Sequence, residues 1–308
     1  MYIHGVVGAA GVGTTATAVN IAATLRSEGH HAAMLDLTGD VVDMFDVPVD
    51  AAVADALAGD ASAGDATARV EYLEEVTDEL RDYYESLGPQ QTTFQTGADD
   101  VEADPHEPEP GALPVVVGGD RGTFGEASSD ELETVRADLE FAYDHVIADA
   151  RTLGPAVATM VDDVIAVTDV QEENLLTAEQ GIAACAEEGI TVMGAVVNRA
   201  GHQTDISWLS NRLDTEILAV VPEDERTPEV EPVAHTAPDS PAGAAYDRLT
   251  DRVVEWDGDS GLIDGGPDGE VAADGEGDDD GGVLSQIVKS WATGPDDHDG
   301  SQPPFRGM

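Results

Sequence analysis

Short apolar runs alternate with stretches of helical periodicity along most of the chain, and this alternation limits the fold more than any other feature. The runs carry few polar positions, which predicts strands that are buried on both faces. Such strands, separated by helices, form a mostly parallel sheet with helices on both faces, the α/β class. The predicted strands are Tyr2–Val7, Ala32–Leu37, Pro114–Val117, His145–Ala148, Val164–Val167, Thr191–Val197 and Ile217–Val221. The predicted helices are Thr15–Ser27, Ser129–Tyr143, Glu173–Glu187 and Ile206–Leu213, with a closing helix after Ser240.

The first strand and the first helix are joined by the glycine-rich turn GAAGVGTT, Gly8 to Thr15. This layout is typical of a phosphate-binding loop, whose pattern is GxxxxGK[ST]. Gly8, Gly13 and Thr15 fit the pattern, and Gly11 adds the backbone freedom that aims N–H groups at a ligand. The lysine position, however, holds Thr14. The turn therefore predicts a phosphate site that lacks its usual cation.

A dinucleotide-binding turn is the main alternative for the same residues. The letters VVGAAGVG resemble the GAxGxxG turn of some NAD-dependent dehydrogenases, and Asp36 ends the next strand, where a ribose-binding acid would lie. The third glycine of that turn would fall on Thr14, however, so the spacing is off by one. A dinucleotide-binding oxidoreductase is therefore the less favoured interpretation.

Further motifs, in order along the chain, resemble the ParA/MinD family of P-loop ATPases with a deviant Walker A loop. The similarity runs from Tyr2 to about Trp256, and it rests on the order and spacing of motifs that are weak individually. These motifs are AAGVGTTA from Ala9, Asp36-Leu37-Thr38, DHVIADA with Asp149, VDDVIAVT, GAVVNRA with Asn198 and Arg199, and VVPEDE at Val220–Glu225. The resemblance implies a P-loop NTPase fold and a site for ATP or ADP with Mg²⁺.

The resemblance also implies roles for individual residues. The phosphate loop would be formed by Gly8, Gly11, Gly13, Thr14 and Thr15. The Thr15 hydroxyl and Asp149 would hold Mg²⁺, Asp36 would help to position the attacking water, and Asn198 would read the adenine edge.

Three departures from the family pattern weaken this site. Ala9 and Thr14 replace lysines, and Thr38 replaces the second acid of the D-x-D motif. A charged hydrogen bond contributes roughly 1.5–3 kcal/mol, so losing two lysines weakens phosphate binding by about 10²- to 10⁴-fold. We therefore expect weak nucleotide binding or none, and negligible ATP hydrolysis. Alternatively, Arg151 supplies the missing cation and the chain is an active ATPase, or Arg151 is a surface arginine paired with a nearby acid.

The charge of the chain points to its surroundings rather than to a partner. The formal net charge is −51, with 64 acidic residues against twelve arginines and the single lysine Lys289. An acid-rich, lysine-poor composition is similar to that of proteins from cells with high internal salt, where repulsion between carboxylates is screened. The absence of a basic stripe argues against nucleic-acid binding. The lone Cys185 fits a reducing cytoplasm.

Two acidic segments fall outside the predicted domain of residues 1–256. Glu71–Gly111 holds thirteen acidic residues and one arginine, and it is predicted to be an insertion. Residues 257–308 form a predicted flexible tail with a short amphipathic helix over 282–293. The apolar stripe of that helix consists of Val283, Leu284, Ile287, Val288 and Trp291.

The stripe is expected to bind a protein partner or a membrane surface, which would place the protein peripherally on the membrane, or to fold back on its own domain. The resemblance further implies a homodimer, although Ala9 replaces the lysine that would reach the second subunit. Together these features predict a regulatory or spatial-organisation factor with an eroded nucleotide site.

Overall fold

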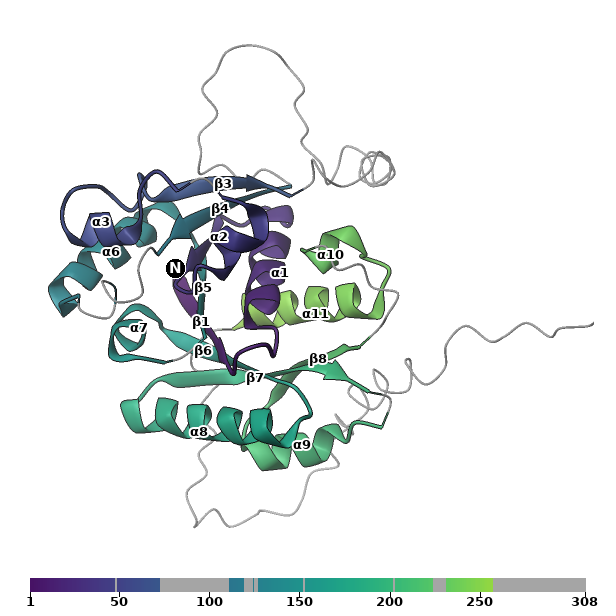
Figure 1. Ribbon diagram of the computed structural model, residues 1–308. Coiled ribbons are helices and arrows are strands. Elements are labelled where there is room, and N and C mark those ends of the chain that lie inside the picture. Colours follow the sequence, from purple (N-terminus) through teal and green to yellow (C-terminus); the bar gives the residue numbers. More distant parts are fainter. Residues whose placement is uncertain are drawn as a thin grey trace, which may run out of the picture.

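The computed structural model describes residues 1–256 apart from 48, 73–110, 119–123, 125–126, 152, 202 and 224–230. Within these residues the strands form one eight-stranded sheet in the order β3-β4-β2-β5-β1-β6-β7-β8 (Figure 1). Every neighbouring pair is parallel except β3 and β4, which confirms the predicted fold class. The strands are β1 (Tyr2–Gly8), β2 (Ala32–Asp36), β3 (Thr67–Glu71), β4 (Ala112–Val117), β5 (His145–Arg151), β6 (Asp163–Thr168), β7 (Thr191–Ala200) and β8 (Ile217–Pro222).

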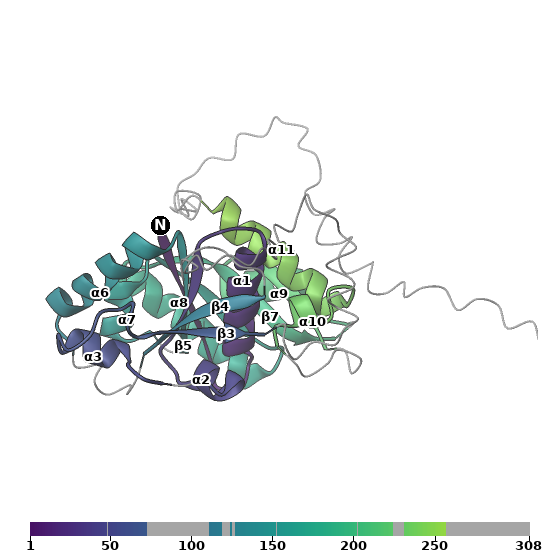
Figure 2. The same cartoon turned by 90° about the horizontal axis from the view of Figure 1, so that it is seen from above.

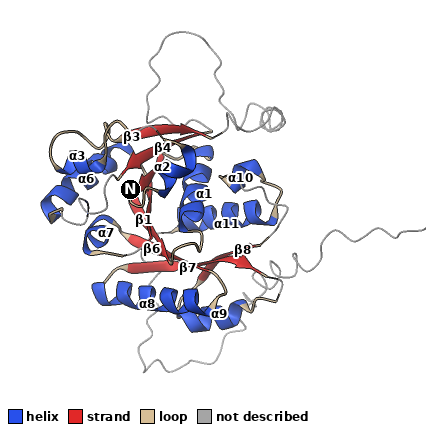
Figure 3. Cartoon of the chain, viewed as in Figure 1, coloured by secondary structure: helices blue, strands red, loops and turns tan. Residues whose placement is uncertain are grey.

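Helices cover both faces of this sheet (Figures 2 and 3). One face packs against α1, α10 and α11, and the other packs against α3, α6, α7, α8 and α9. The described helices are α1 (Thr14–Ser27), α2 (Asp40–Phe45), α3 (Val53–Leu57), α6 (Ser129–Ala142), α7 (Pro155–Met160), α8 (Glu172–Glu188), α9 (Ile206–Leu213), α10 (Val233–Thr236) and α11 (Pro241–Glu255). The closing helix begins as predicted, because the Ser240 hydroxyl accepts a hydrogen bond from the Gly243 N–H at 3.0 Å.

The continuous apolar strands are explained by these two helical layers. Successive strand residues point to opposite faces, so Val6 lies in the core beside α1 while Val7 lies in the core beside α6 and α7. Both cores are apolar, so a strand between them has no solvent-exposed face. The alternation of polar and apolar residues that marks a half-exposed strand is therefore missing.

Helix α1 positions the glycine-rich turn, because it begins directly after Gly13 and runs back along the sheet. Its residues are buried almost all round, including the fully buried Ile21 and Leu25. Burying a side chain of that size stabilises the fold by about 1.5–3 kcal/mol. The helix is thus fixed along its length, and so is the turn at its N-terminus.

Strand β3 was not predicted from the sequence. Its residues pair antiparallel with β4, from Thr67 opposite Val116 to Glu71 opposite Ala112. The N–H of Tyr72 then donates to the Gly111 carbonyl at 3.1 Å. Both ends of the segment predicted as an insertion therefore belong to the edge of the sheet.

Residues 73–110 of the predicted insertion and the whole of 257–308 lie outside the described residues. The tail includes the predicted partner stripe of Val283, Leu284, Ile287, Val288 and Trp291, which stays a prediction. Among the helices that the structure describes, none combines the length and the apolarity that crossing a membrane requires.

Candidate functional site

The glycine-rich turn lies at the carboxyl end of β1 and requires glycine at three positions, the pattern residues Gly8 and Gly13 and the additional Gly11. Gly11 and Gly13 have φ angles of 81° and 94°, in the left-handed region that favours glycine. A Cβ on Gly8 would meet the Val167 carbonyl oxygen at 2.3 Å, and one on Gly13 would meet the Asn198 side-chain nitrogen at 2.5 Å. The residues that carried the sequence interpretation are thus those whose replacement the backbone does not allow.

Three N–H groups of the turn have no partner among the described residues, although the Val12 N–H donates to the Ala9 carbonyl at 3.4 Å. Among the described residues, the N–H groups of Gly13, Thr14 and Thr15 donate to no protein atom. They stand at the N-terminus of the fourteen-residue helix α1, where the helix dipole adds a partial positive charge. Free N–H groups in this arrangement bind anions such as phosphate. Thr14, at the lysine position, is 4% exposed and contributes a hydroxyl group instead of an ammonium group.

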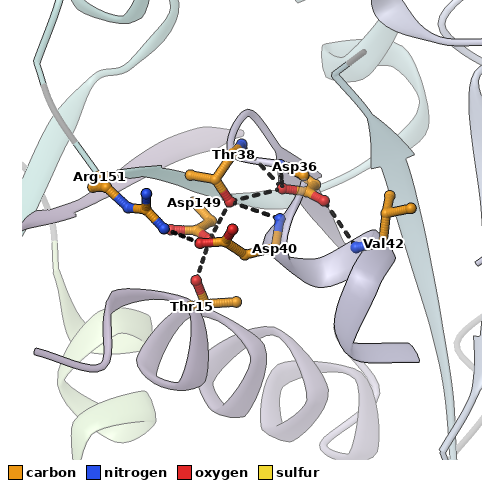
Figure 4. A network of polar contacts seen from close by, with 8 residues as sticks. Thr15, Asp36, Thr38, Asp40, Val42, Asp149 and Arg151 are labelled. Atoms are coloured by element: carbon orange, nitrogen blue, oxygen red, sulfur yellow. Dashed lines mark hydrogen bonds and ion pairs between the residues drawn. The ribbon is translucent and has the colours of Figure 1, made fainter. Parts of the chain in front are cut away.

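A buried carboxylate lies next to the turn, at the end of β5 (Figure 4). Oδ2 of Asp149 accepts hydrogen bonds from the hydroxyls of Thr15, at 2.6 Å, and of Thr38, at 2.8 Å. Oδ1 of Asp149 is buried, and no described residue hydrogen-bonds to it. Burial raises the pKa of Asp149, the two hydroxyl hydrogen bonds lower it, and the charges of Asp36 and Asp40 raise it further.

This arrangement fits a magnesium ion. The structure brings together the Thr15 hydroxyl and the Asp149 carboxylate, the two ligands expected from sequence, and leaves one buried carboxylate oxygen unsatisfied. In the described part of the chain, no group of three or more His, Cys, Asp or Glu residues forms a metal site. Mg²⁺ would therefore need phosphate oxygens and water for its remaining ligands, and its binding stays a prediction.

Asp36, the predicted catalytic acid, is occupied by the backbone of the following turn (Figure 4). Its Oδ1 accepts hydrogen bonds from the N–H groups of Thr38, at 3.1 Å, and Gly39, at 2.8 Å. Its Oδ2 accepts one from Val42 at 3.0 Å. The carboxylate thus holds the start of α2 in place, and a role in positioning water stays a prediction.

The sequence matches no family model and no curated protein. The structure, in contrast, is similar to solved ATPases. The cell division ATPase MinD of Pyrococcus furiosus has a TM-score of 0.60 and 18% identity, covering 82% of this chain and 98% of that one. The septum site-determining protein MinD of Pyrococcus horikoshii, solved with Mg-ADP, has a TM-score of 0.57 and 22% identity, covering 82% and 95%.

A ParA family ATPase from Chlorobium tepidum TLS has a TM-score of 0.56 and 17% identity, covering 81% of this chain and 97% of that one. This chain has the ParA/MinD fold. The likeness spans nearly the full length of the solved proteins, and at these identities it concerns the fold alone.

The strand order of this ParA/MinD fold also weighs against the dinucleotide alternative. In the common dinucleotide-binding sheet the first two strands are neighbours, in the order 3-2-1-4-5-6. Here β5 lies between β1 and β2. The carboxyl ends of β1 and β5 therefore meet beside the turn, which places Asp149 next to Thr15.

The side chain of Arg151, the predicted substitute cation, points to α2 and is not left unpaired beside the turn. Its guanidinium group forms an ion pair with Asp40, the first residue of α2 (Figure 4). Arg151 is itself in the left-handed backbone conformation, with φ 54°. This contact corresponds to the paired-surface-arginine alternative.

Asn198 reaches the turn, but through its amide nitrogen. This nitrogen donates to the carbonyl oxygen of Val12 at 2.9 Å, and it lies 3.4 Å from that of Gly13 and 3.3 Å from the Thr17 hydroxyl. The amide oxygen is buried and accepts no hydrogen bond from any described residue. Recognition of adenine by Asn198 stays a prediction, with that oxygen as its available atom.

Two contacts at this site were not expected from the sequence. A guanidinium nitrogen of Arg199 donates to the Gly11 carbonyl at 2.7 Å. Farther along α1, the Asn20 amide nitrogen donates to Glu231 at 2.6 Å, and burial raises the pKa of that carboxyl. Asn20, which stands between the apolar Val19 and Ile21 of α1, is the signal that could have pointed to a buried polar partner.

Proposed function

We propose that this chain is a nucleotide-binding protein of the ParA/MinD type, a regulatory or spatial-organisation factor that binds Mg-ATP or Mg-ADP weakly and hydrolyses ATP negligibly. One observation carries the proposal. The unpaired N–H groups of Gly13, Thr14 and Thr15 and the unsatisfied oxygen of Asp149 belong to one site, and no lysine stands at Ala9 or Thr14.

Binding is supported by groups that carry no full positive charge. The N–H groups of the turn and the N-terminus of α1 favour an anion. Thr15 and Asp149 would hold Mg²⁺, which when bound would neutralise part of the phosphate charge. The P. horikoshii MinD, which shares this fold, was solved with Mg-ADP. Without the two lysines, the affinity is expected to be low.

Hydrolysis is expected to suffer more than binding. Charge that develops on the transferring phosphate must be stabilised by cations placed in advance. Ala9 and Thr14 supply none, and Arg151 is engaged by Asp40. Both oxygens of Asp36 already accept backbone hydrogen bonds, which leaves this acid poorly placed to orient a water molecule.

A protein without turnover has to act through what it binds. We propose that residues 282–293 bind a protein partner or a membrane surface through their apolar stripe, and that nucleotide binding modulates this contact. A homodimer around the nucleotide is part of the same proposal, weakened by the loss of lysine at Ala9. Because the chain is strongly acidic, a groove on a protein partner is a better binding site for this stripe than a membrane of anionic lipid.

The active-ATPase alternative predicts turnover that depends on Arg151, and the oxidoreductase alternative predicts affinity for NAD. Titration of the pure protein at high salt with Mg-ATP, Mg-ADP and NAD tests the oxidoreductase alternative, and an assay of ATP hydrolysis by the wild type and Arg151→Ala tests the active-ATPase alternative. We expect weak binding of the two adenine nucleotides and none of NAD. The double variant Ala9→Lys with Thr14→Lys should then bind both nucleotides more tightly. The proposal would be contradicted if neither the wild type nor the double variant bound an adenine nucleotide.

A further inference from the structure

Arg199, in the GAVVNRA motif at the end of β7, lies at the rim of the glycine-rich turn and has no role assigned so far. It lies in β7, it is exposed, and its backbone is in the left-handed region with φ 51°. One guanidinium nitrogen donates to the carbonyl oxygen of Gly11 at 2.7 Å. A guanidinium group has five N–H donors, so this contact leaves most of them available.

The charge of Arg199 is not matched by any described acid. Five other described arginines contact carboxylates, namely Arg69 with Glu71, Arg136 with Asp162, Arg151 with Asp40, Arg212 with Glu172, and Arg252 with Glu216, whereas the exposed Arg248 of α11 has no carboxylate within 4.0 Å among the described residues. Arg199 has no carboxylate within 4.0 Å in the described part of the chain. In a sequence with 64 acidic residues and only twelve arginines, an unmatched guanidinium group at an anion site points to a ligand.

The strand order shows which part of a nucleotide Arg199 would meet. Thr15 and Asp149 lie at the β1–β5 side of the turn, whereas Arg199 belongs to β7, two strands away from β1 on the other side. Thr15 and Asp149 would hold Mg²⁺, which would neutralise charge on the terminal phosphates of the nucleotide. The terminal phosphates would therefore lie toward Asp149, and Arg199 would face the phosphates nearer the nucleoside.

We infer that Arg199 supplies the positive charge that the turn has lost at Ala9 and Thr14, by linking the Gly11 carbonyl to the phosphate nearer the nucleoside. The inference rests on the proposed nucleotide site and assigns its cation to Arg199 rather than to Arg151. Since ADP and ATP share this phosphate, Arg199 strengthens the binding of both equally. It therefore supports binding without adding charge at the γ-phosphate, where hydrolysis needs it.

The test is calorimetric titration of Mg-ADP and Mg-ATP into the full-length wild type and three variants at one fixed high salt concentration. Arg199→Gln removes the charge and shortens the side chain while keeping it polar. Arg199→Lys keeps the positive charge but lacks the planar set of N–H donors of a guanidinium group. Arg252→Gln is the matched control, because it removes an exposed arginine of α11 that pairs with Glu216. Melting temperatures establish that each variant is folded.

We expect Arg199→Gln to weaken the binding of both nucleotides by the same factor, about tenfold or more. Arg199→Lys should lose less affinity, and the control should lose none. Equal affinities for the wild type and Arg199→Gln would overturn the inference and show that Arg199 only holds the loop, while the proposed function stands. A loss confined to Mg-ATP would also overturn it. A wild type that binds neither nucleotide would contradict the proposed function and this inference together.

Discussion

The hydroxyl of Thr38 lies 2.8 Å from Oδ2 of Asp149, the same carboxylate oxygen that the Thr15 hydroxyl approaches at 2.6 Å. Two hydroxyl groups from different segments therefore converge on one oxygen and leave Oδ1 of Asp149 without a described partner. Thr38 occupies the place of an acid in the resembling motif. An acid there would repel Asp149, whereas the hydroxyl group stabilises its charge.

The first prediction is that Thr38→Val destabilises the fold. A hydrogen bond to a charged group contributes about 1.5–3 kcal/mol, and valine has nearly the shape of threonine. We expect the free energy of unfolding, measured by denaturant titration, to fall by about 1.5 kcal/mol. Thr177→Val is the control, because the exposed Thr177 hydroxyl donates only to a backbone carbonyl of its own helix. The Thr38 hydroxyl also lies 3.1 Å from Oδ1 of Asp36, so equal losses in the two variants would mean that its contacts with the two carboxylates contribute nothing particular.

The second prediction separates backbone strain from side-chain contact in the glycine-rich turn. Gly13 and Gly29 have similar φ angles, 94° and 91°, but only at Gly13 would a Cβ meet another residue, Asn198 at 2.5 Å. Gly29→Ala should cost about 1–2 kcal/mol for the left-handed backbone alone. Gly13→Ala should cost clearly more and should also weaken nucleotide binding.

Adding Asn198→Ala isolates the steric part of that effect. The smaller side chain removes the clash, so the cost of Gly13→Ala in the Asn198→Ala background should fall toward that of Gly29→Ala. Denaturant titrations of the wild type, Gly13→Ala, Asn198→Ala and the double variant measure this coupling. If Gly13→Ala and Gly29→Ala cost the same, the close packing of Asn198 against the turn is wrong.

The third prediction concerns stability at mildly acid pH. Burial lowers the pKa of His235 from 6.5 to about 4, against a backbone hydrogen bond to Ala23 that raises it. Between these values the unfolded chain binds more protons than the folded one, so stability is lost as pH falls from 6.5 toward 4. The loss approaches about 3 kcal/mol for this one group. His235→Gln should remove that part of the pH dependence in denaturant titrations from pH 7 to pH 4. An unchanged slope in the variant would contradict the prediction.

The fourth prediction concerns the tail beyond the described residues. Deleting Val283–Trp291 should abolish capture of a partner protein or of vesicles, because it removes the apolar stripe. The melting temperature of the domain should stay unchanged. A large drop in melting temperature would show instead that the segment packs on its own domain.

The fold was largely predictable because it depends on features that are local in sequence. Strands buried between two helical layers appear as continuous apolar runs, and the φ angles of Gly11 and Gly13 demand glycine wherever the turn occurs. The edge strand β3 was missed because Arg69 and Glu71 face solvent there and give it a polar appearance.

The pairings within the site were not predictable in the same way. Arg151 meets Asp40, and Asn198 meets Val12, across separations of 111 and 186 residues. Nothing local in the sequence distinguishes an arginine that faces a phosphate from one that faces a carboxylate. Only the strand order, which places β5 beside both β1 and β2, decides which acid Arg151 contacts.

The fifth prediction tests the central claim, that the turn keeps an anion site but has lost the cations of catalysis. The measurement is single-turnover hydrolysis of Mg-ATP at high salt, with the protein in excess, for the wild type and Arg151→Ala. We predict that neither protein releases phosphate above the rate of a protein-free control, because Ala9 and Thr14 supply no charge and Arg151 is paired with Asp40. Hydrolysis by the wild type that is lost in Arg151→Ala would show that Arg151 leaves Asp40 to serve the phosphate. Hydrolysis that survives in both would contradict the account directly.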